Sequence, residues 1–152
     1  MQIRPSTPTD TPKIAHLREQ TIRHVNSKDY SQKTIEDWSS KKNTQNLKDN
    51  ADTNKRWVAV DKGVIVGFCE HTASCEISRI YVHKDYLRQG VGSGLLEVAE
   101  NSLIKQGCKK VYIESTTTAK DFYKKNGYKV IKNDFHNQDK KAPIYIMSKN
   151  LH

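Results

Sequence analysis

Long apolar stretches are missing from this chain of 152 residues, and apolar side chains make up only 35% of it. No run approaches the roughly 18 apolar residues of a membrane span, and Met1–Arg4 leads directly into polar sequence without a signal-peptide core. Cysteine is scarce: Cys69, Cys75 and Cys108 lack metal-ligand spacing, which predicts free thiols in a reducing compartment. These absences argue against a membrane protein, a zinc ribbon and a secreted disulfide scaffold, and they predict a cytoplasmic protein.

Charge of one sign is in excess. The chain has 26 Lys and Arg against 17 Asp and Glu, a formal net charge of +9. The excess is concentrated in residues 101–152, which hold eleven lysines and four acidic side chains. Such an uneven balance is typical of a protein with an anionic partner, such as nucleic acid, an acidic macromolecule or a phosphorylated cofactor, although a lysine-rich surface kept for solubility has the same composition.

Apolar periodicity predicts alternating runs of strands and helices. In chain order these are the strand Gln2–Arg4, a helix with Ile14, Leu17, Ile22 and Val25 on its apolar side, a helix from about Ser31, the strands Trp57–Val60, Val64–Phe68 and Cys75–Val82, a helix from about Gly92 to Gln106, the strand Lys110–Glu114, a short helix Thr118–Asn126, and the strands Tyr128–Phe135 and Ile144–Ser148. The order fits one mixed α/β (α+β) domain over residues 1–152.

Three turns are marked by their residues. Asp61-Lys62-Gly63 is a hairpin sequence, while Gly107 and Gly127 stand where each preceding helix should end in the left-handed conformation.

The most informative stretch runs from Ile80 to Leu96, where a strand passes through a polar loop into Gly90-x-Gly92-x-Gly94 at the start of a helix. Glycines let successive backbone N–H groups converge, and the helix N-terminus adds partial positive charge, so the turn can cradle a diphosphate. It is not a P-loop, because no Gly-Lys-Ser/Thr follows. It also differs from the dinucleotide fingerprint, because the turn is too long and no acidic residue sits on a following strand.

A second segment, Thr118 to Tyr128, contains Phe122-Tyr123-x-x-x-Gly127-Tyr128. Together with the glycine turn, it resembles the GNAT superfamily of acyl-CoA N-acyltransferases, in a small bacterial branch. The resemblance covers nearly the whole chain and includes the opening Ile3-Arg4 strand and the Val64–Phe68 strand. It implies a mixed, mostly antiparallel sheet that splays open between the fourth and fifth strands, with helices on both faces.

The resemblance also implies how acetyl-CoA binds. In the family, a Gln/Arg-x-x-Gly-x-Gly/Ala signature holds the pyrophosphate through backbone amides, and the strand before it aligns with the pantetheine arm. Leu87 departs from the usual Gln or Arg, so we expect some loss of side-chain support. The positions expected to bind the donor are the strand residues Ile80, Tyr81 and Val82, the cradle residues Leu87, Arg88, Gln89, Gly90, Val91, Gly92 and Ser93, and Thr118 and Tyr123.

Acetyl transfer to an amine needs a base, because an alkylammonium with a pKa near ~10.4 does not attack while charged. Glu76 matches the position of the base glutamate in histone-acetylating members, and Glu114 is the second candidate; some members use another residue or a water chain. Tyr123 matches the family's general acid, which protonates the departing thiolate. Strict strand alternation puts Glu76 on one face with Ser78, Ile80 and Val82, although a bulge would change this grouping.

Other side chains are assigned by the resemblance to the acceptor side. His24, Tyr30 and Glu114 are candidates for acceptor contacts, and the polar segments Ser39–Asn54 and His136–Pro143 are expected to shape the acceptor pocket. Trp38 is expected in the core, His71 and His83 are treated as structural, and the Lys124-Lys125 pair as a solvated helix face. No metal site is assigned.

The sequence therefore predicts an N-acetyltransferase that moves acetyl from acetyl-CoA to a primary amine by direct attack in a ternary complex, as a monomer or homodimer, with no membrane partner. Two alternatives stay open. One is an acetylator of a macromolecule, either a protein lysine or a charged tRNA, for which the lysine-rich last third is the only support. Nucleic acid is otherwise not an expected partner. The other is a non-catalytic CoA-binding module, which the departure at Leu87 favours.

Overall fold

In a computed structural model of the chain, residues 1–24, 26–38, 53–135 and 143–151 are described. Their strands form one seven-stranded sheet in the order β1-β2-β3-β4-β5-β7-β6. The strands are β1 (Gln2–Pro5), β2 (Lys55–Asp61), β3 (Val64–His71), β4 (Glu76–Val82), β5 (Lys110–Thr116), β6 (Lys129–Phe135) and β7 (Pro143–Asn150). Every predicted strand is present, with bounds that differ by a few residues. The polar segments expected to shape the acceptor pocket lie largely outside the described residues.

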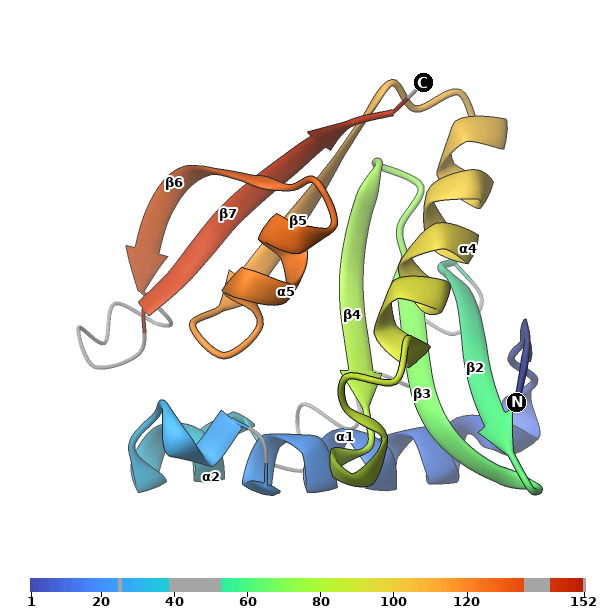
Figure 1. The fold of residues 1–152 in the computed structure, drawn as a ribbon, viewed down its shortest axis with the longest axis vertical. Coiled ribbons are helices and arrows are strands. Elements are labelled where there is room, and N and C mark those ends of the chain that lie inside the picture. Colours follow the sequence, from blue (N-terminus) through green and yellow to red (C-terminus); the bar gives the residue numbers. More distant parts are fainter. Residues whose placement is uncertain (25, 39–52, 136–142, 152) are drawn as a thin grey trace.

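All neighbouring strands pair antiparallel except β4 and β5, which are parallel. Their pairing is short and joins only Glu76 with Tyr112 and Ile77 with Ile113. Beyond that point the two strands diverge, so the sheet opens like a V between them (Figure 1). The predicted splay between the fourth and fifth strands is confirmed.

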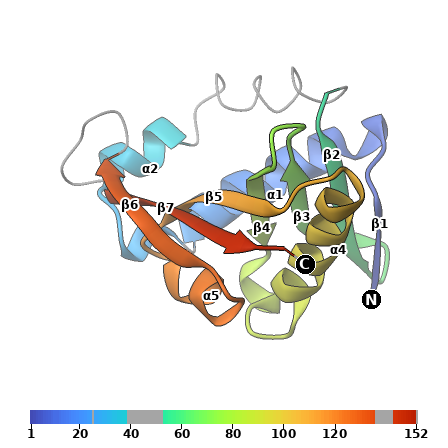
Figure 2. The same cartoon turned by 90° about the horizontal axis from the view of Figure 1, so that it is seen from above.

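Helices cover both faces of the sheet, as predicted (Figure 2). Helices α1 and α2 lie on one side, and α4 and α5 lie on the other. The helices are α1 (Thr11–His24), α2 (Gln32–Trp38), α4 (Val91–Lys105) and α5 (Lys120–Lys125), with short 3₁₀ helices η1 (Pro8–Asp10), η2 (Asn26–Lys28) and η3 (Lys84–Tyr86). The sequence pattern did not reveal the 3₁₀ helices, because three residues are too few to show a period.

The largest core lies between α4 and the sheet. Leu95, Leu96, Ala99 and Leu103 recur at helical spacing along α4 and are fully buried against β3, β4 and β5. Gly67 on β3 makes this close packing possible: a Cβ there would lie 2.8 Å from Val91 Cγ1 and 2.9 Å from Leu95 Cδ1. A smaller core joins α1 to the opposite face and consists of Ile14, Leu17, Val58, Ile65 and Phe68.

The glycine turns have the predicted geometry. Lys62 and Gly63 both have positive φ, 50° and 78°, as a two-residue hairpin of the primed type requires. Gly107 follows α4 with φ 98°, and Gly127 follows α5 with φ 94°. Local chemistry therefore determines where these elements end.

Strand β4 is irregular at Ser78. The register pairs Glu70 with Arg79 and His71 with Ile77, which leaves Ser78 without a partner on β3. This is a β-bulge, which inserts one residue and reverses the alternation of side chains beyond it.

The bulge overturns one prediction from strict alternation. Glu76, Ser78, Ile80 and Val82 do not share a face. Ile77, Ile80 and Val82 all pack against the α4 core, whereas Ser78 donates a hydrogen bond to Glu70 on the other face. Since Glu76 neighbours Ile77 along the strand, its side chain lies on the Ser78 side.

The prediction of three free cysteines is also wrong. Cys75 and Cys108 form a disulfide with their Cα atoms 5.8 Å apart, and only Cys69 is free and buried. They are 33 residues apart in sequence, so only the packing of α4 on the sheet brings them together. Sequence spacing carries no signal for this pair.

Candidate functional site

The open edge of β4 is the first component of the site. His83 N donates to Val66 O on β3 at 2.9 Å, so backbone alternation turns the N–H groups of Val82 and Ile80 away from β3. They face the opening, where β5 has already diverged. Tyr81 has the opposite orientation, because its backbone faces Phe68 on β3. The bulge at Ser78 sets this alternation, so an extended ligand could pair with β4 like an added strand.

The glycine turn follows directly. Arg88 and Gly90 adopt left-handed backbone with φ 60° and 84°, and Gly90 is the N-cap of α4. The first hydrogen bond of the helix runs from Gly94 N to Gly90 O at 3.0 Å. The amides of the preceding residues, Val91 to Ser93, therefore have no acceptor within the helix. A cluster of such amides at a helix N-terminus attracts phosphate.

The side chains of the turn contribute less. Leu87 is 42% exposed, and Arg88 and Gln89 are also exposed. Gln89 Nε2 donates to Asp85 O at 3.1 Å, which holds the turn together rather than leaving that amide for a ligand. The structure therefore offers mainly backbone groups to a ligand at this turn.

Helix α5 packs on the start of α4. A Cβ on Gly92 would lie 2.8 Å from Phe122 Cζ, so Gly92 has to be small for the two helices to meet. This contact places the β5–α5 turn, which contains Thr118, beside the mouth of the opening.

Tyr123 is the next residue on α5 and is 4% exposed. Its ring meets that of Tyr128 edge-on, with centroids 5.7 Å apart. Burial, and then the neighbouring Cys69 and Tyr81, raises the pKa of the Tyr123 hydroxyl well above its usual range. The hydroxyl is protonated at neutral pH with or without this shift, and the shift itself makes it a weaker acid.

The two candidate bases lie in one pocket. A hollow of about 290 Å³ is lined by Glu76, Glu114, Tyr112, Ile113 and Ile146. Partial burial raises the pKa of Glu76, and the negative charges of Glu114 and Glu70 raise it further. A raised pKa improves a carboxylate as a base, because its proton affinity comes closer to that of an amine.

A buried ion cluster supports this pocket, and sequence reasoning missed it. Glu70 is 1% exposed and binds Arg56 and Arg79, with Arg79 Nη1 at 3.4 Å. Ser78 Oγ, at the bulge, donates to Glu70 Oε1 at 2.6 Å. The bulge is therefore held by a charged acceptor beneath it. These residues lie within strands whose alternating pattern gives no sign in the sequence that they form an ion cluster.

Hydrogen bonds of Tyr30 and Thr118 join the segment after α1 to the end of β5. The Tyr30 hydroxyl accepts from Thr117 N at 2.6 Å and donates to Pro143 O at 2.8 Å, so it bridges the end of β5 and the start of β7. Thr118 Oγ1 donates to Asp29 Oδ2 at 2.8 Å. Tyr30 is buried, with 7% of its surface exposed, and these two hydrogen bonds satisfy its hydroxyl group.

The remaining candidates are spread out. His24 is exposed at the end of α1, apart from the acidic hollow. Trp38 packs edge-on against Tyr30 with centroids 4.7 Å apart. His71 is buried between Thr72 O and Ser102 Oγ, as expected of a structural histidine.

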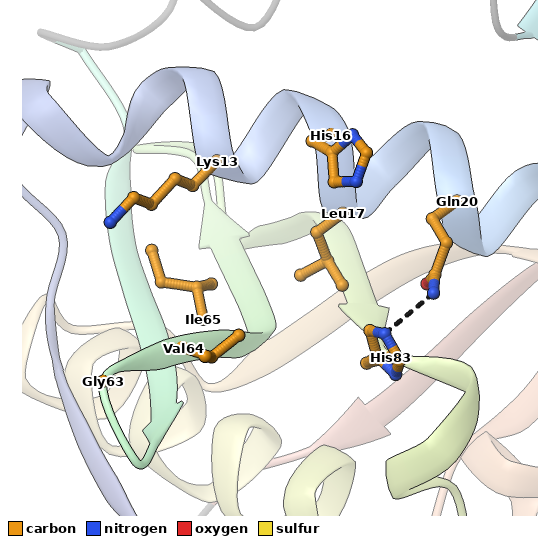
Figure 3. A pocket seen from close by; sticks show the side chains of 8 residues that line it. All are labelled: Lys13, His16, Leu17, Gln20, Gly63, Val64, Ile65 and His83. Atoms are coloured by element: carbon orange, nitrogen blue, oxygen red, sulfur yellow. Dashed lines mark hydrogen bonds between the residues drawn. The ribbon is translucent and has the colours of Figure 1, made fainter.

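A second hollow, of about 300 Å³, lies between α1 and the β2–β3 hairpin (Figure 3). Lys13, His16 and Gln20 reach it from α1, and His83 reaches it from below, with Gln20 Nε2 2.8 Å from His83 Nε2. None of the sequence-predicted site residues lines it. It is separate from the acidic hollow and from the turn at α4.

Across the described parts of the chain, no group of three or more His, Cys, Asp or Glu is arranged to hold a metal ion. Within those same residues, no helix combines the length and apolar character that a membrane crossing requires.

Known proteins resemble this chain over nearly its full length. The family model described as acetyltransferase (GNAT) domain matches residues 26–148. A GCN5-related N-acetyltransferase from Rhodopseudomonas palustris is 25% identical, with a TM-score of 0.91 over 99% of this chain and 95% of that one. No match to a curated protein sequence is found at a significant level.

Two further structures share the fold at lower identity. The PaiA N-acetyltransferase from Thermoplasma acidophilum, solved with coenzyme A, is 22% identical with a TM-score of 0.77 over 98% of both chains. The ribosomal-protein-S18-alanine N-acetyltransferase from Escherichia coli is 19% identical with a TM-score of 0.73, covering 99% of this chain and 93% of that one.

Proposed function

Because this chain belongs to the GNAT acetyltransferases, we propose that it transfers acetyl from acetyl-CoA to a primary amine by direct attack in a ternary complex. The observation that carries the proposal is the continuity of two backbone features. The unpaired edge of β4 at Ile80 and Val82 leads within ten residues into the free amides at the start of α4. One feature suits an extended amide-bearing arm and the other suits a diphosphate.

The residues of the cradle fit the donor. Gly90 supplies the left-handed cap that aims the amides of Val91 to Ser93 outward, and its own Cβ position is open, with nothing within 4 Å. Ser93 is exposed beside these amides. When bound, acetyl-CoA supplies an activated acetyl group and a thiolate leaving group. The N–H groups of Ile80 and Val82 are positioned to pair with the arm and polarise the thioester carbonyl.

Glu76 or Glu114 takes the proton from the acceptor ammonium, directly or through water. Both carboxylates line the same hollow, and its other lining side chains, Tyr112, Ile113 and Ile146, are largely apolar. An ammonium group that enters this hollow is attracted by the two carboxylates and contacts apolar side chains. Glu76 is the preferred base because its pKa is raised by burial and by Glu114.

Tyr123 donates the proton that the departing thiolate needs. Its hydroxyl is protonated at neutral pH, as an ordinary tyrosine hydroxyl with a pKa near ~10 is.

The test is a calorimetric titration with acetyl-CoA, with CoA, ATP and NAD as controls, followed by an acceptor panel. Dissociation constants on the order of 10 μM for acetyl-CoA, and nothing comparable for NAD, are expected. The panel contains small mono- and diamines, a lysine peptide and charged tRNA, so that a macromolecular acceptor is distinguished from a small one. Binding without turnover on any acceptor would favour a non-catalytic CoA-binding module instead.

A further inference from the structure

The Cys75–Cys108 disulfide sits at the closed end of the opening between β4 and β5. Cys75 immediately precedes β4, and Cys108 lies in the turn that leads from α4 into β5. Cys75 O accepts a hydrogen bond from Tyr112 N of β5 at 3.0 Å. The parallel pairing next to it spans only two residue pairs, Glu76 with Tyr112 and Ile77 with Ile113. The disulfide therefore links the starts of the two strands, next to this short stretch of backbone pairing.

The bond also fixes the residue before a candidate base. Cys75 has left-handed backbone with φ 60°, which is unfavourable for a side chain that is not glycine. The backbone of Glu76 continues from it, and Thr72 N donates to Glu76 O at 2.8 Å. Glu76 and Tyr112 both line the acidic hollow. The disulfide is therefore bonded to the residue next to Glu76, and Glu76 pairs with Tyr112 of the same hollow.

The two cysteine residues differ in exposure. Cys75 is half-buried and follows the exposed residues Ala73 and Ser74, whereas Cys108 is 7% exposed. An incoming thiolate therefore reaches Cys75 more easily than Cys108. Lys109 and Lys110 follow Cys108 and are exposed, and nearby cations stabilise a departing thiolate.

We propose that the Cys75–Cys108 disulfide is a thiol–disulfide exchange site for dithiols, and that its reduction releases the start of β4 and displaces Glu76 in the acidic hollow. The first thiolate of the dithiol attacks Cys75 Sγ, forms a mixed disulfide and expels the Cys108 thiolate, which takes up a proton. The second thiolate attacks the dithiol's own sulfur in the mixed disulfide and expels the Cys75 thiolate. The protein gains two thiols and the dithiol becomes a disulfide. The consequence for catalysis rests on the proposed function.

The first experiment needs no acceptor. Folded protein is treated with dithiothreitol or buffer, then with iodoacetamide, and the alkylated cysteines are counted by mass. We expect no alkylation in buffer, since Cys69 is buried, and two labelled cysteines, Cys75 and Cys108, after dithiothreitol. Amide hydrogen exchange is then compared between the two states. The peptide from Cys75 to Ser78 and that around Tyr112 should exchange at least tenfold faster when reduced, while the amides of α5 stay unchanged.

Matched variants separate the switch from a general loss of structure. The double variant Cys75→Ala, Cys108→Ala should show the amide hydrogen exchange of the reduced protein, with or without dithiothreitol. The single variant Cys69→Ala should change its amide hydrogen exchange on reduction as the parent chain does. Unlabelled cysteines after reduction, or equal exchange in the two states, would overturn the proposal.

If an acceptor is found, kinetics give a second readout. We expect reduction to lower kcat/KM for the acceptor at least fivefold, with the Kd for acetyl-CoA within twofold, and reoxidation by glutathione disulfide to restore it. Equal kcat/KM in the two states would contradict the catalytic part. Absence of turnover in both states would instead count against the proposed function. Thiol labelling and amide hydrogen exchange would still test the proposed thiol–disulfide exchange at Cys75 and Cys108.

Discussion

Gly92 on α4 and Phe122 on α5 are in such close contact that a single added methyl group would collide: a Cβ on Gly92 would stand 2.8 Å from Phe122 Cζ. The glycine of the cradle therefore has a packing role as well as the expected role at the pyrophosphate. A bulky or charged residue at Gly92 would disturb both, so it could not report on binding alone.

Gly92→Ala should lower the free energy of unfolding by about 1–3 kcal/mol, because overpacking forces the Phe122 ring to move. The double variant with Phe122→Leu should recover part of this loss. Urea denaturation of the two single variants and the double variant, analysed as a double-mutant cycle, measures the coupling. Additive effects would show that the two side chains do not constrain each other.

Ser93→Asp tests the cradle without that collision. Ser93 is exposed in the first turn of α4, where an acidic residue favours the helix but repels a diphosphate. Calorimetry should show a Kd for acetyl-CoA raised about tenfold, with unfolding free energy unchanged or slightly higher. Ser93→Asn is the control, because Asn is neutral and nearly isosteric with Asp, and this variant should bind acetyl-CoA like the parent. The difference between the two should shrink in 0.5 M salt; equal affinities would place the pyrophosphate elsewhere.

Tyr123→Phe removes the proposed proton donor and little else, because the ring stays packed against Tyr128. We expect kcat to fall about 10²-fold with the Kd for acetyl-CoA within twofold, as for loss of a general acid. Tyr112→Phe is the comparison, since Tyr112 lines the acidic hollow and is 40% exposed. Unchanged turnover in Tyr123→Phe would remove it from the mechanism.

Glu114→Gln should shift the pH dependence of kcat/KM. The pKa of Glu76 is raised by burial and by the charge of Glu114, and a base acts only when ionised. Activity therefore rises with pH through that pKa. Removing the negative charge of Glu114 lowers the pKa, so the acid limb of the profile should move to lower pH.

Comparison with Glu76→Gln identifies the base. If Glu76 is the base, Glu76→Gln should lose at least tenfold in kcat/KM while Glu114→Gln mainly shifts the limb. The reverse pattern would assign the role to Glu114. Glu97→Gln, an exposed position on α4, should leave the profile unchanged.

Tyr30→Phe should destabilise the fold by about 1–3 kcal/mol, because the partly buried amide of Thr117 loses its acceptor and Pro143 O loses its donor. Thermal or urea unfolding measures the effect. A variant as stable as the parent would mean that water replaces both bonds, and the bridge between β5 and β7 would then be dispensable.

Features that depend on neighbouring residues could be predicted from the amino-acid sequence. Gly63, Gly107 and Gly127 have left-handed backbone, which glycine adopts without steric cost. The apolar periods indicate the element type because each element buries one face. The strand–turn–helix unit that ends in Gly90 was recognisable for the same reason. The family resemblance added the opening between β4 and β5.

Features that depend on residues far apart in the sequence became visible only in the folded chain. The bulge at Ser78 forms over the buried Glu70, and it turns Ile80 and Val82 toward the opening, which strict alternation cannot foresee. Cys75 meets Cys108 only because α4 returns the chain to the start of β4. In each case a contact between separated segments outweighs the local pattern, since burying a charge or closing a loop is a property of the packed chain.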